Sequence, residues 1–273
     1  MALKLNNTRE AYKSFPEKGT APNVKQMPLL IADGRVPMNT SQLMQRRLDV
    51  RNSGNEVKSA WMDNYFDTGD AVVYHPDGRV KIVLDSQDLR NMTPDTPRNS
   101  GALIVVPEVY DTLQGEEFKE GKLGQVNEWM SRKDVKAHPV WKVLARDQRL
   151  LNDYTDHIFG EYQARFAKGT SLGEIRAMRV FLDSAGDNPK MRAWCVSGLV
   201  DRSSAYGRGN LENDSGRFLG IAPEALGAVG KGVGSVKAYT VADLQEAEKQ
   251  LDNLSQVVKP ESLKKVRSLV EKL

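Results

Sequence analysis

The sequence predicts an α+β fold in which small antiparallel or mixed sheets surround a long central helix, followed by a C-terminal helical hairpin. Three observations carry this prediction. A β-hairpin signal lies over residues 71–84, apolar residues recur at helical spacing over residues 139–166, and two further apolar stripes end the chain. Strands and helices do not alternate regularly, which argues against a doubly wound parallel sheet.

The composition is that of a folded, weakly basic protein. Of its 273 residues, 40% are hydrophobic and 27% are charged, and the net charge is +3. This balance excludes a disordered chain, and no apolar run approaches the roughly 20 residues of a membrane helix. The first residues lack the apolar stretch of a secretory signal, and the single cysteine, Cys195, excludes an internal disulfide. We therefore expect a cytoplasmic protein.

Three segments are expected along the chain. Residues 1–26 lack apolar periodicity and contain several turn-forming residues, so we expect an extended N-terminal arm. An α+β core over residues 27–235 follows, and its polar stretch over residues 114–138 offers an inner boundary. Residues 236–273 form the predicted helical hairpin.

The first half of the core is predicted to hold short strands and one helix. The apolar run over residues 28–32 is typical of a strand, and the capping chemistry that follows predicts a helix over about 41–50. Residues 71–84 contain two β-rich runs around a Pro-Asp-Gly turn, which predicts a hairpin. Residues 102–106 form an uncharged apolar run that predicts a buried strand.

The second half of the core is dominated by helical periodicity. Its apolar stripe over residues 139–166 predicts one helix of nearly eight turns, which we expect to be the spine of the core. Two strands are expected next, over Arg176–Leu182 and Met191–Val200. In the last segment, Thr240-Val-Ala-Asp243 is a capping-box variant that opens the first helix of the hairpin.

The region from residue 171 to residue 220 is unusually rich in arginine, and half of the chain's 22 glycines fall between Gly173 and Gly234. Glycine lets backbone amides approach a ligand closely. The guanidinium fork of arginine binds carboxylate or phosphate oxygens in pairs, unlike the point charge of lysine. We therefore expect a segment suited to holding an anion. Its basic residues are Arg176, Arg179, Lys190, Arg192, Arg202, Arg208 and Arg217.

The polar loop over residues 201–217 is the predicted ligand-binding site. Its side chains can clamp an anionic group, with the backbone amides of glycines beside it. Acidic residues are nearly as frequent as basic ones over residues 171–220, so internal arginine–carboxylate pairs that staple the loop also explain the composition. Long ordered loops are often functional, which keeps the binding interpretation open. The predicted contact residues are Arg202, Tyr206, Gly207, Arg208, Asn210 and Arg217.

Three other motifs offer weaker chemistry. Residues 227–235 look like a phosphate-binding loop, but the glycines before the lysine are three residues apart instead of five, so we expect a flexible connector. Asp153, His157 and Glu161 share one helical face, yet solvated ion pairs explain that spacing, and we predict no metal site. Cys195 lies in a predicted strand without a histidine nearby in sequence and is expected to be a core residue. No cofactor is predicted.

We predict a binding protein for an anionic, phosphate-bearing partner, and the absence of a catalytic signature leans against an enzyme. Nucleic acid or a ribonucleoprotein is a candidate partner because both chain ends are basic. The sequence shows no interleaving of basic and aromatic residues, which argues against a platform that stacks single-stranded bases.

Two alternatives remain open from the sequence. The first is an enzyme acting on a small anionic substrate at the same loop, with Asp183, Asp187 or Asp201 as acid or base. The second is a self-assembling structural protein that forms a homo-oligomer through the hairpin over residues 236–273. No membrane partner is expected.

Overall fold

The computed structural model describes residues 2–5, 11–119, 121–184 and 186–223. They belong to the first of two compact units, Met1–Lys231. The second unit, Gly232–Leu273, lies outside the described residues, and the predicted hairpin over residues 236–273 lies there with it.

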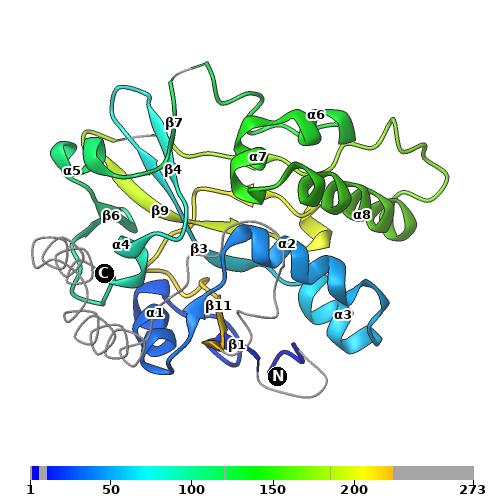
Figure 1. The fold of residues 1–273 in the computed structure, drawn as a ribbon, viewed down its shortest axis with the longest axis horizontal. Coiled ribbons are helices and arrows are strands. Elements are labelled where there is room, and N and C mark those ends of the chain that lie inside the picture. Colours follow the sequence, from blue (N-terminus) through cyan, green and yellow to red (C-terminus); the bar gives the residue numbers. More distant parts are fainter. Residues whose placement is uncertain (1, 6–10, 120, 185, 224–273) are drawn as a thin grey trace, which may run out of the picture. The chain divides into compact units, whose positions relative to one another are not determined.

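Within the described residues, eleven strands form one mixed sheet, and its main path runs β1-β11-β3-β9-β10-β8. Figure 1 labels β1, β11, β3 and β9 of this path. The expectation of small sheets around a long central helix is therefore wrong. The reason is the nine-residue strand β3, which is buried along its whole length and pairs on both sides. The strands of this path are β1 (Tyr12–Phe15), β3 (Phe66–Tyr74), β8 (Val180–Phe181), β9 (Lys190–Val196), β10 (Ala205–Tyr206) and β11 (Phe218–Ile221).

Shorter strands extend this path. The predicted hairpin over residues 71–84 is confirmed, because β4 pairs antiparallel with β3 at Val72↔Ile82 and Gly78 takes the turn at φ +88°. The predicted strand at residues 102–106 is confirmed over Ala102–Ile104. The added strands are β2 (Val36–Pro37), β4 (Val80–Val83), β5 (Arg98–Asn99), β6 (Ala102–Ile104) and β7 (Glu116–Phe118).

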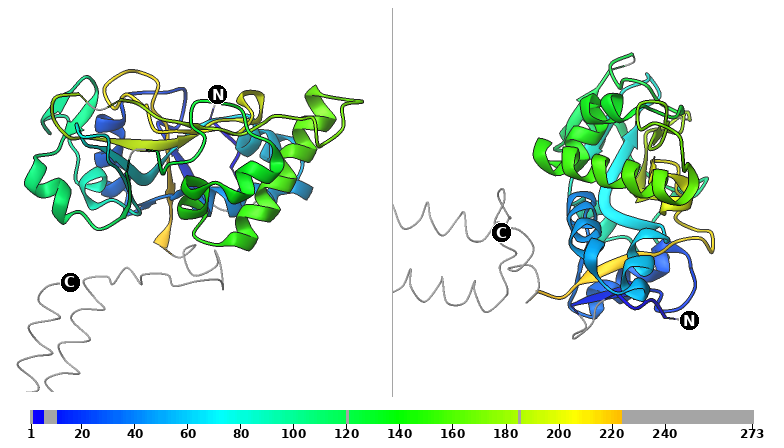
Figure 2. Two further views of the ribbon diagram at one scale, coloured as in Figure 1. Left: turned by 90° about the horizontal axis from the view of Figure 1, so that it is seen from above. Right: turned by 90° about the vertical axis from the view of Figure 1, so that its right-hand side faces the viewer.

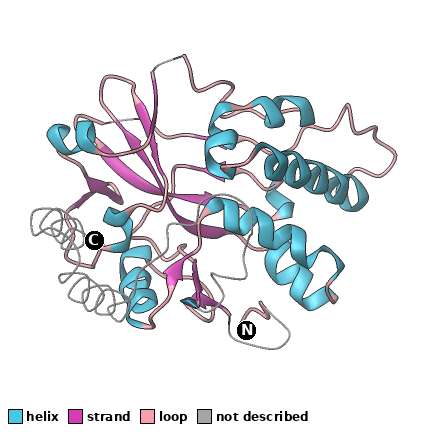
Figure 3. Ribbon diagram, in the orientation of Figure 1, coloured by secondary structure: helices cyan, strands magenta, loops and turns pink. Residues whose placement is uncertain are grey.

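The helices pack against this sheet in two groups (Figure 3). They are α1 (Asn23–Ala32), α2 (Thr40–Asp49), α3 (Asn55–Met62), α4 (Gln87–Arg90), α5 (Pro107–Thr112), α6 (Arg132–Ala137), α7 (Pro139–Ala145) and α8 (Gln148–Phe166), with 3-10 turns η1 (Val50–Asn52) and η2 (Leu199–Asp201). The helix predicted over about 41–50 is confirmed as α2, which Asn39 caps in a capping box with Gln42. The strand predicted over residues 28–32 is wrong: these residues end α1, because Met27 and Leu30 bury at helical spacing.

The predicted long helix over residues 139–166 is broken in two. Arg146 takes a left-handed conformation, with φ at 62°, and ends α7, and Asp147 then caps α8 by accepting from the Leu150 amide. The Arg146 guanidinium donates to Asp70 at 2.8 Å and to Asp85 at 2.6 Å. These two ion pairs with the sheet region hold the break, and neither is visible in the local sequence.

The two faces of the central strand are buried by different helices. Val72 and Tyr74 pack with Trp141 and Ile158 of the α7–α8 layer. The alternate residues of the strand pack in a second cluster with Met27 and Leu30 of α1 and Tyr110 of α5. Figure 2 shows α6, α7 and α8 grouped together beside α2. Among the described residues, no helix combines the length and the apolarity needed to span a membrane.

Candidate anion-binding surface

Three arginines lie against aromatic rings at the edge of the sheet. Arg179 lies 4.1 Å from the ring centroid of Trp129 and 4.5 Å from that of Phe181. Each of these two rings also contacts a second arginine. Arg202 lies 4.5 Å from the Trp129 centroid, and Arg208 lies 4.4 Å from the Phe181 centroid. We call this set the arginine–aromatic ladder, and it consists of Tyr162, Arg202, Trp129, Arg179, Phe181, Tyr206 and Arg208.

The sheet places the middle of the ladder. Strands β8 and β10 are parallel, with Phe181 opposite Tyr206 and Val180 opposite Ala205. Side chains alternate along a strand, so the burial of Val180 and Ala205 under the α7–α8 layer turns Phe181 and Tyr206 to the other face. Arg179, two residues before Phe181, shares that face and donates to the Tyr206 hydroxyl at 2.9 Å.

Trp129 comes from a segment that runs beside β8. The Asn127 amide donates to the Val180 carbonyl at 2.8 Å, and the Asn127 side chain accepts from the Leu182 amide at 3.0 Å. An isolated bridge joins Met130 to Ala177. These contacts fix the indole beside β8, where it meets Arg179.

Arg202 is placed by a buried arginine on another element. Arg202 and Ser203 both adopt positive φ, at 57° and 52°, directly after η2. The fully buried Arg47 of α2 donates to the Ser203 hydroxyl at 2.9 Å and to the Ser197 carbonyl at 3.1 Å. The same guanidinium also donates to Tyr154 of α8. Arg47 therefore holds the turn that directs Arg202 to Trp129 and Tyr162.

The three arginines of the ladder have few carboxylates near them. Among the described residues, neither Arg179 nor Arg202 has a carboxylate oxygen within 4.0 Å, and Arg208 reaches Asp183 only at 3.9 Å. Asp183 is already engaged by Lys190 at 2.9 Å and Arg192 at 3.1 Å. Burial acts to raise the pKa of Asp183, but the hydrogen bond from Lys190 and the nearby positive charges hold it below its ordinary value.

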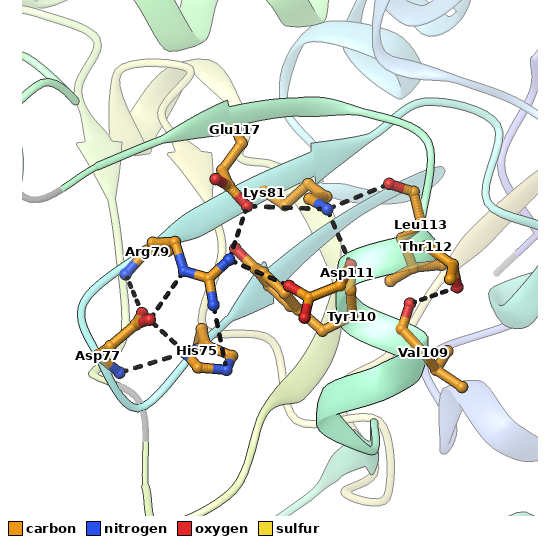
Figure 4. A network of polar contacts seen from close by, with 10 residues as sticks. All are labelled: His75, Asp77, Arg79, Lys81, Val109, Tyr110, Asp111, Thr112, Leu113 and Glu117. Carbon is orange, nitrogen blue, oxygen red and sulfur yellow. Dashed lines mark hydrogen bonds and ion pairs between the residues drawn. The ribbon is translucent and has the colours of Figure 1, made fainter.

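In a second polar network, by contrast, carboxylates lie close to the cations (Figure 4). At the β3–β4 hairpin, the Arg79 guanidinium pairs with three carboxylates, and His75 lies 2.7 Å from one of them. Lys81 is buried and donates to the backbone carbonyls of Tyr110 in α5 and of Leu113 directly after it. Every cation there has partners within the protein, so we assign the network a structural role. Its carboxylates are Asp77, Asp111 and Glu117.

The structure divides the six predicted contact residues into two groups. Arg202, Tyr206 and Arg208 belong to the ladder. Gly207, Asn210 and Arg217 lie outside the ladder, and their contacts are with backbone groups and an asparagine side chain instead of the arginine–carboxylate pairs of the stapling interpretation. The buried Gly207 amide donates to the Phe181 carbonyl at 2.8 Å, and a Cβ at Gly207 would lie 2.4 Å from the Tyr74 hydroxyl.

The other two residues of this second group bond within the loop and at its end. The Asn210 side chain accepts from the Glu212 amide at 2.8 Å. The Arg217 guanidinium donates to the Gly19 carbonyl at 2.9 Å and to the Asn64 side chain at 2.7 Å. The Asn210 bond lies within residues 207–217, and the Arg217 bonds join the end of that segment to the body of the unit.

The predicted contact residues omit four members of the ladder: Trp129, Tyr162, Arg179 and Phe181. Of these, the sequence indicated only Arg179, as one of the basic residues of the anion-holding segment. Basic and aromatic residues do interleave, but in space and across four segments, so a search for interleaving along the chain cannot find them. One local signal existed. Arg179 and Phe181 are two residues apart in a predicted strand, which places them on one face.

The weaker motifs show no assembled chemistry in the described part of the chain. Glu161 pairs with Lys58 and Arg165, and the described residues contain no group of three metal-ligating side chains that could hold an ion. Burial raises the pKa of the Cys195 thiol well above its ordinary value, which suppresses the thiolate. The glycine motif at residues 227–235 lies outside the described residues.

Comparison with known proteins informs the fold. No protein-family model and no curated protein matches the chain. A solved structure from Nanoarchaeota, in which the C-type lectin fold accommodates massive sequence variation, is similar to this chain with a TM-score of 0.53. The two sequences are 13% identical, and the match covers 79% of this chain and 100% of the other. At that identity the likeness shows architecture alone: this chain resembles the C-type lectin fold.

Proposed function

We propose that this protein binds an anionic, phosphate-bearing partner through the arginine–aromatic ladder. One observation carries the proposal: three guanidinium groups lie against rings at the edge of the sheet, and among the described residues Arg179 and Arg202 have no carboxylate within 4.0 Å while Arg208 has one only at 3.9 Å. An arginine side chain that is not paired with a carboxylate can still donate charge-assisted hydrogen bonds to an oxyanion of a ligand.

The rings contribute by preorganising the cations. An arginine side chain loses up to about 2 kcal/mol of rotamer entropy when it is fixed. Contact with Trp129 and Phe181 restricts Arg179 before a ligand arrives, and cation–π attraction adds about 0.5–1 kcal/mol per contact at exposed sites. A ligand that binds at the ladder therefore causes a smaller loss of side-chain entropy than one that binds to unrestrained surface arginines.

The enzyme alternative has less support from the geometry. Asp183 is engaged in ion pairs with Lys190 and Arg192, and Asp187 and Asp201 are exposed, so none of the three has the environment of a tuned acid or base. The self-assembly alternative concerns residues outside the described part of the chain and stays a prediction.

Titration calorimetry with inorganic pyrophosphate tests the proposal. We expect Arg208→Lys to weaken binding about tenfold although the charge is kept, because lysine cannot offer the planar pair of donors. Arg149→Lys is the matched control, because the Arg149 side chain is 91% exposed and lies on α8 outside the ladder. The proposal fails if the parent protein does not bind pyrophosphate, or if Arg208→Lys binds it as tightly as the parent does.

A further inference from the structure

We infer that the partner of the ladder is a nucleic acid contacted through its phosphodiester backbone and not through its bases; this inference rests on the proposed function. It follows from three properties of the ladder: the order of its cations, the use of its rings, and the small number of carboxylates near its cations, where among the described residues only Asp183 comes within 4.0 Å of one.

The three guanidinium groups follow one another with a single ring between neighbours. Arg202 and Arg179 share the indole of Trp129, and Arg179 and Arg208 share the ring of Phe181. Neighbouring guanidinium carbons therefore cannot be farther apart than the sum of their two distances to the shared ring. Among the described residues, Arg202 makes a cation–π contact with Trp129 and not with Phe181, and Arg208 makes one with Phe181 and not with Trp129, so the first and the last arginine belong to different rings. A chain of phosphates can contact all three.

The rings are already engaged with cations. Trp129 contacts two guanidinium groups, and Phe181 contacts two guanidinium groups and the Tyr206 ring at a centroid distance of 5.2 Å. A platform that stacks bases needs aromatic faces open to the ligand. The rings of the ladder instead position arginines, so the contact is with phosphate oxygens and carries no direct information about base sequence.

A phosphodiester chain suits this row better than an acidic peptide. Each nucleotide carries a permanent charge on the backbone itself, whereas an acidic peptide must also fix the rotamers of its glutamate or aspartate side chains, at up to about 2 kcal/mol each. The net charge of +3 adds a weak attraction toward a polyanion.

Fluorescence anisotropy with labelled oligonucleotides of about ten residues tests the inference. We expect oligo-dT and oligo-dA to bind with affinities within about threefold of each other, and thymidine monophosphate to compete on the order of 100-fold more weakly than unlabelled oligo-dT. With three phosphates neutralised, the logarithm of the single-strand binding constant should fall against the logarithm of salt concentration with a slope of about −2. A duplex of the same length identifies which form of the backbone binds more tightly, and binding of either form supports the inference.

Variants that remove a charge test whether the ladder causes this salt dependence of binding. Arg179→Gln, Arg202→Gln and Arg208→Gln should each make the slope shallower by about 0.7, whereas Arg149→Gln, which removes the same charge from an exposed helix position, should leave it unchanged. Phe181→Leu keeps all three charges and should weaken binding by releasing Arg179 and Arg208.

Three outcomes overturn the inference. The monophosphate competes as well as the oligomer, a ten-residue glutamate peptide binds more tightly than either oligonucleotide, or the ladder variants keep the parent slope. The first outcome leaves the proposed function intact, because pyrophosphate binding can still depend on Arg208. Loss of pyrophosphate binding as well would remove both.

Discussion

Asp67 is a buried carboxylate whose neutralisation should stabilise the protein. It lies on β3 at 4% exposure, and its carboxylate accepts from the backbone amide of Arg217 at 2.7 Å. Burial raises the pKa of Asp67 from 3.8 to about 6, although hydrogen bonds from Arg217 and Asn23 oppose this rise. The folded state therefore binds this proton more tightly than the unfolded state does.

The sign and size of the effect follow from that difference. Below pH 4 both states are protonated at this group, and above pH 6 both are ionised, so the free energy of unfolding due to Asp67 falls as pH rises from about 4 to about 6. A difference of about two pKa units corresponds to about 3 kcal/mol. Asp67→Asn stays neutral at every pH and can still accept from the Arg217 amide, so it should gain up to about that amount at pH 7 and nothing at pH 4.

Urea unfolding of the parent and Asp67→Asn from pH 4 to pH 8 measures this difference. Other titrating groups contribute equally to both proteins, so the quantity of interest is the gap between the two curves. Asp201→Asn, which removes the same charge from an exposed position of the neighbouring loop, is the matched control. A gap of the same size at pH 4 and pH 7 would mean that the pKa of Asp67 is not raised in the folded protein.

Two further variants test the core and the placement of Arg202. Ile158→Ala should lower the free energy of unfolding by about 2–4 kcal/mol, because Ile158 is fully buried in the α7–α8 core and leaves a cavity; an unchanged urea midpoint would contradict this. Arg47→Lys should cost about 3 kcal/mol, because an ammonium group cannot reach all five acceptors of the guanidinium, and should also weaken oligonucleotide binding through Arg202. Equal affinity of a folded Arg47→Lys protein would remove Arg47 from the placement of the ladder.

Local sequence signals predicted the elements whose causes are local. The turn at residues 75–78 and the capping box before α2 lie next to the elements that they define, and both predictions were confirmed. The break between α7 and α8 has a distant cause, because Arg146 pairs with Asp70 and Asp85 from the β3–β4 region. The single large sheet likewise depends on pairing between β3 and strands more than a hundred residues later.

The candidate site follows the same rule. The excess of arginine and glycine over residues 171–220 pointed to Arg202, Tyr206 and Arg208, all of which lie in the ladder. Trp129 and Tyr162 come from other segments, residues 126–130 and α8. Only tertiary packing brings these segments next to β8 and η2. Sequence also does not show which arginines are already bonded within the protein. Arg217 comes from the same loop, but its guanidinium donates to Gly19 and Asn64, which lie far away in sequence.

The most direct test of phosphate binding at the ladder is an NMR titration that follows the Nε–Hε resonances of individual arginines while oligo-dT is added. We expect the resonances of Arg179, Arg202 and Arg208 to shift together and to saturate at one ligand concentration, whereas Arg47 and Arg192, which are buried and bonded within the protein, stay in place. Shifts confined to arginines outside the ladder, or none at saturating oligonucleotide, would contradict the account.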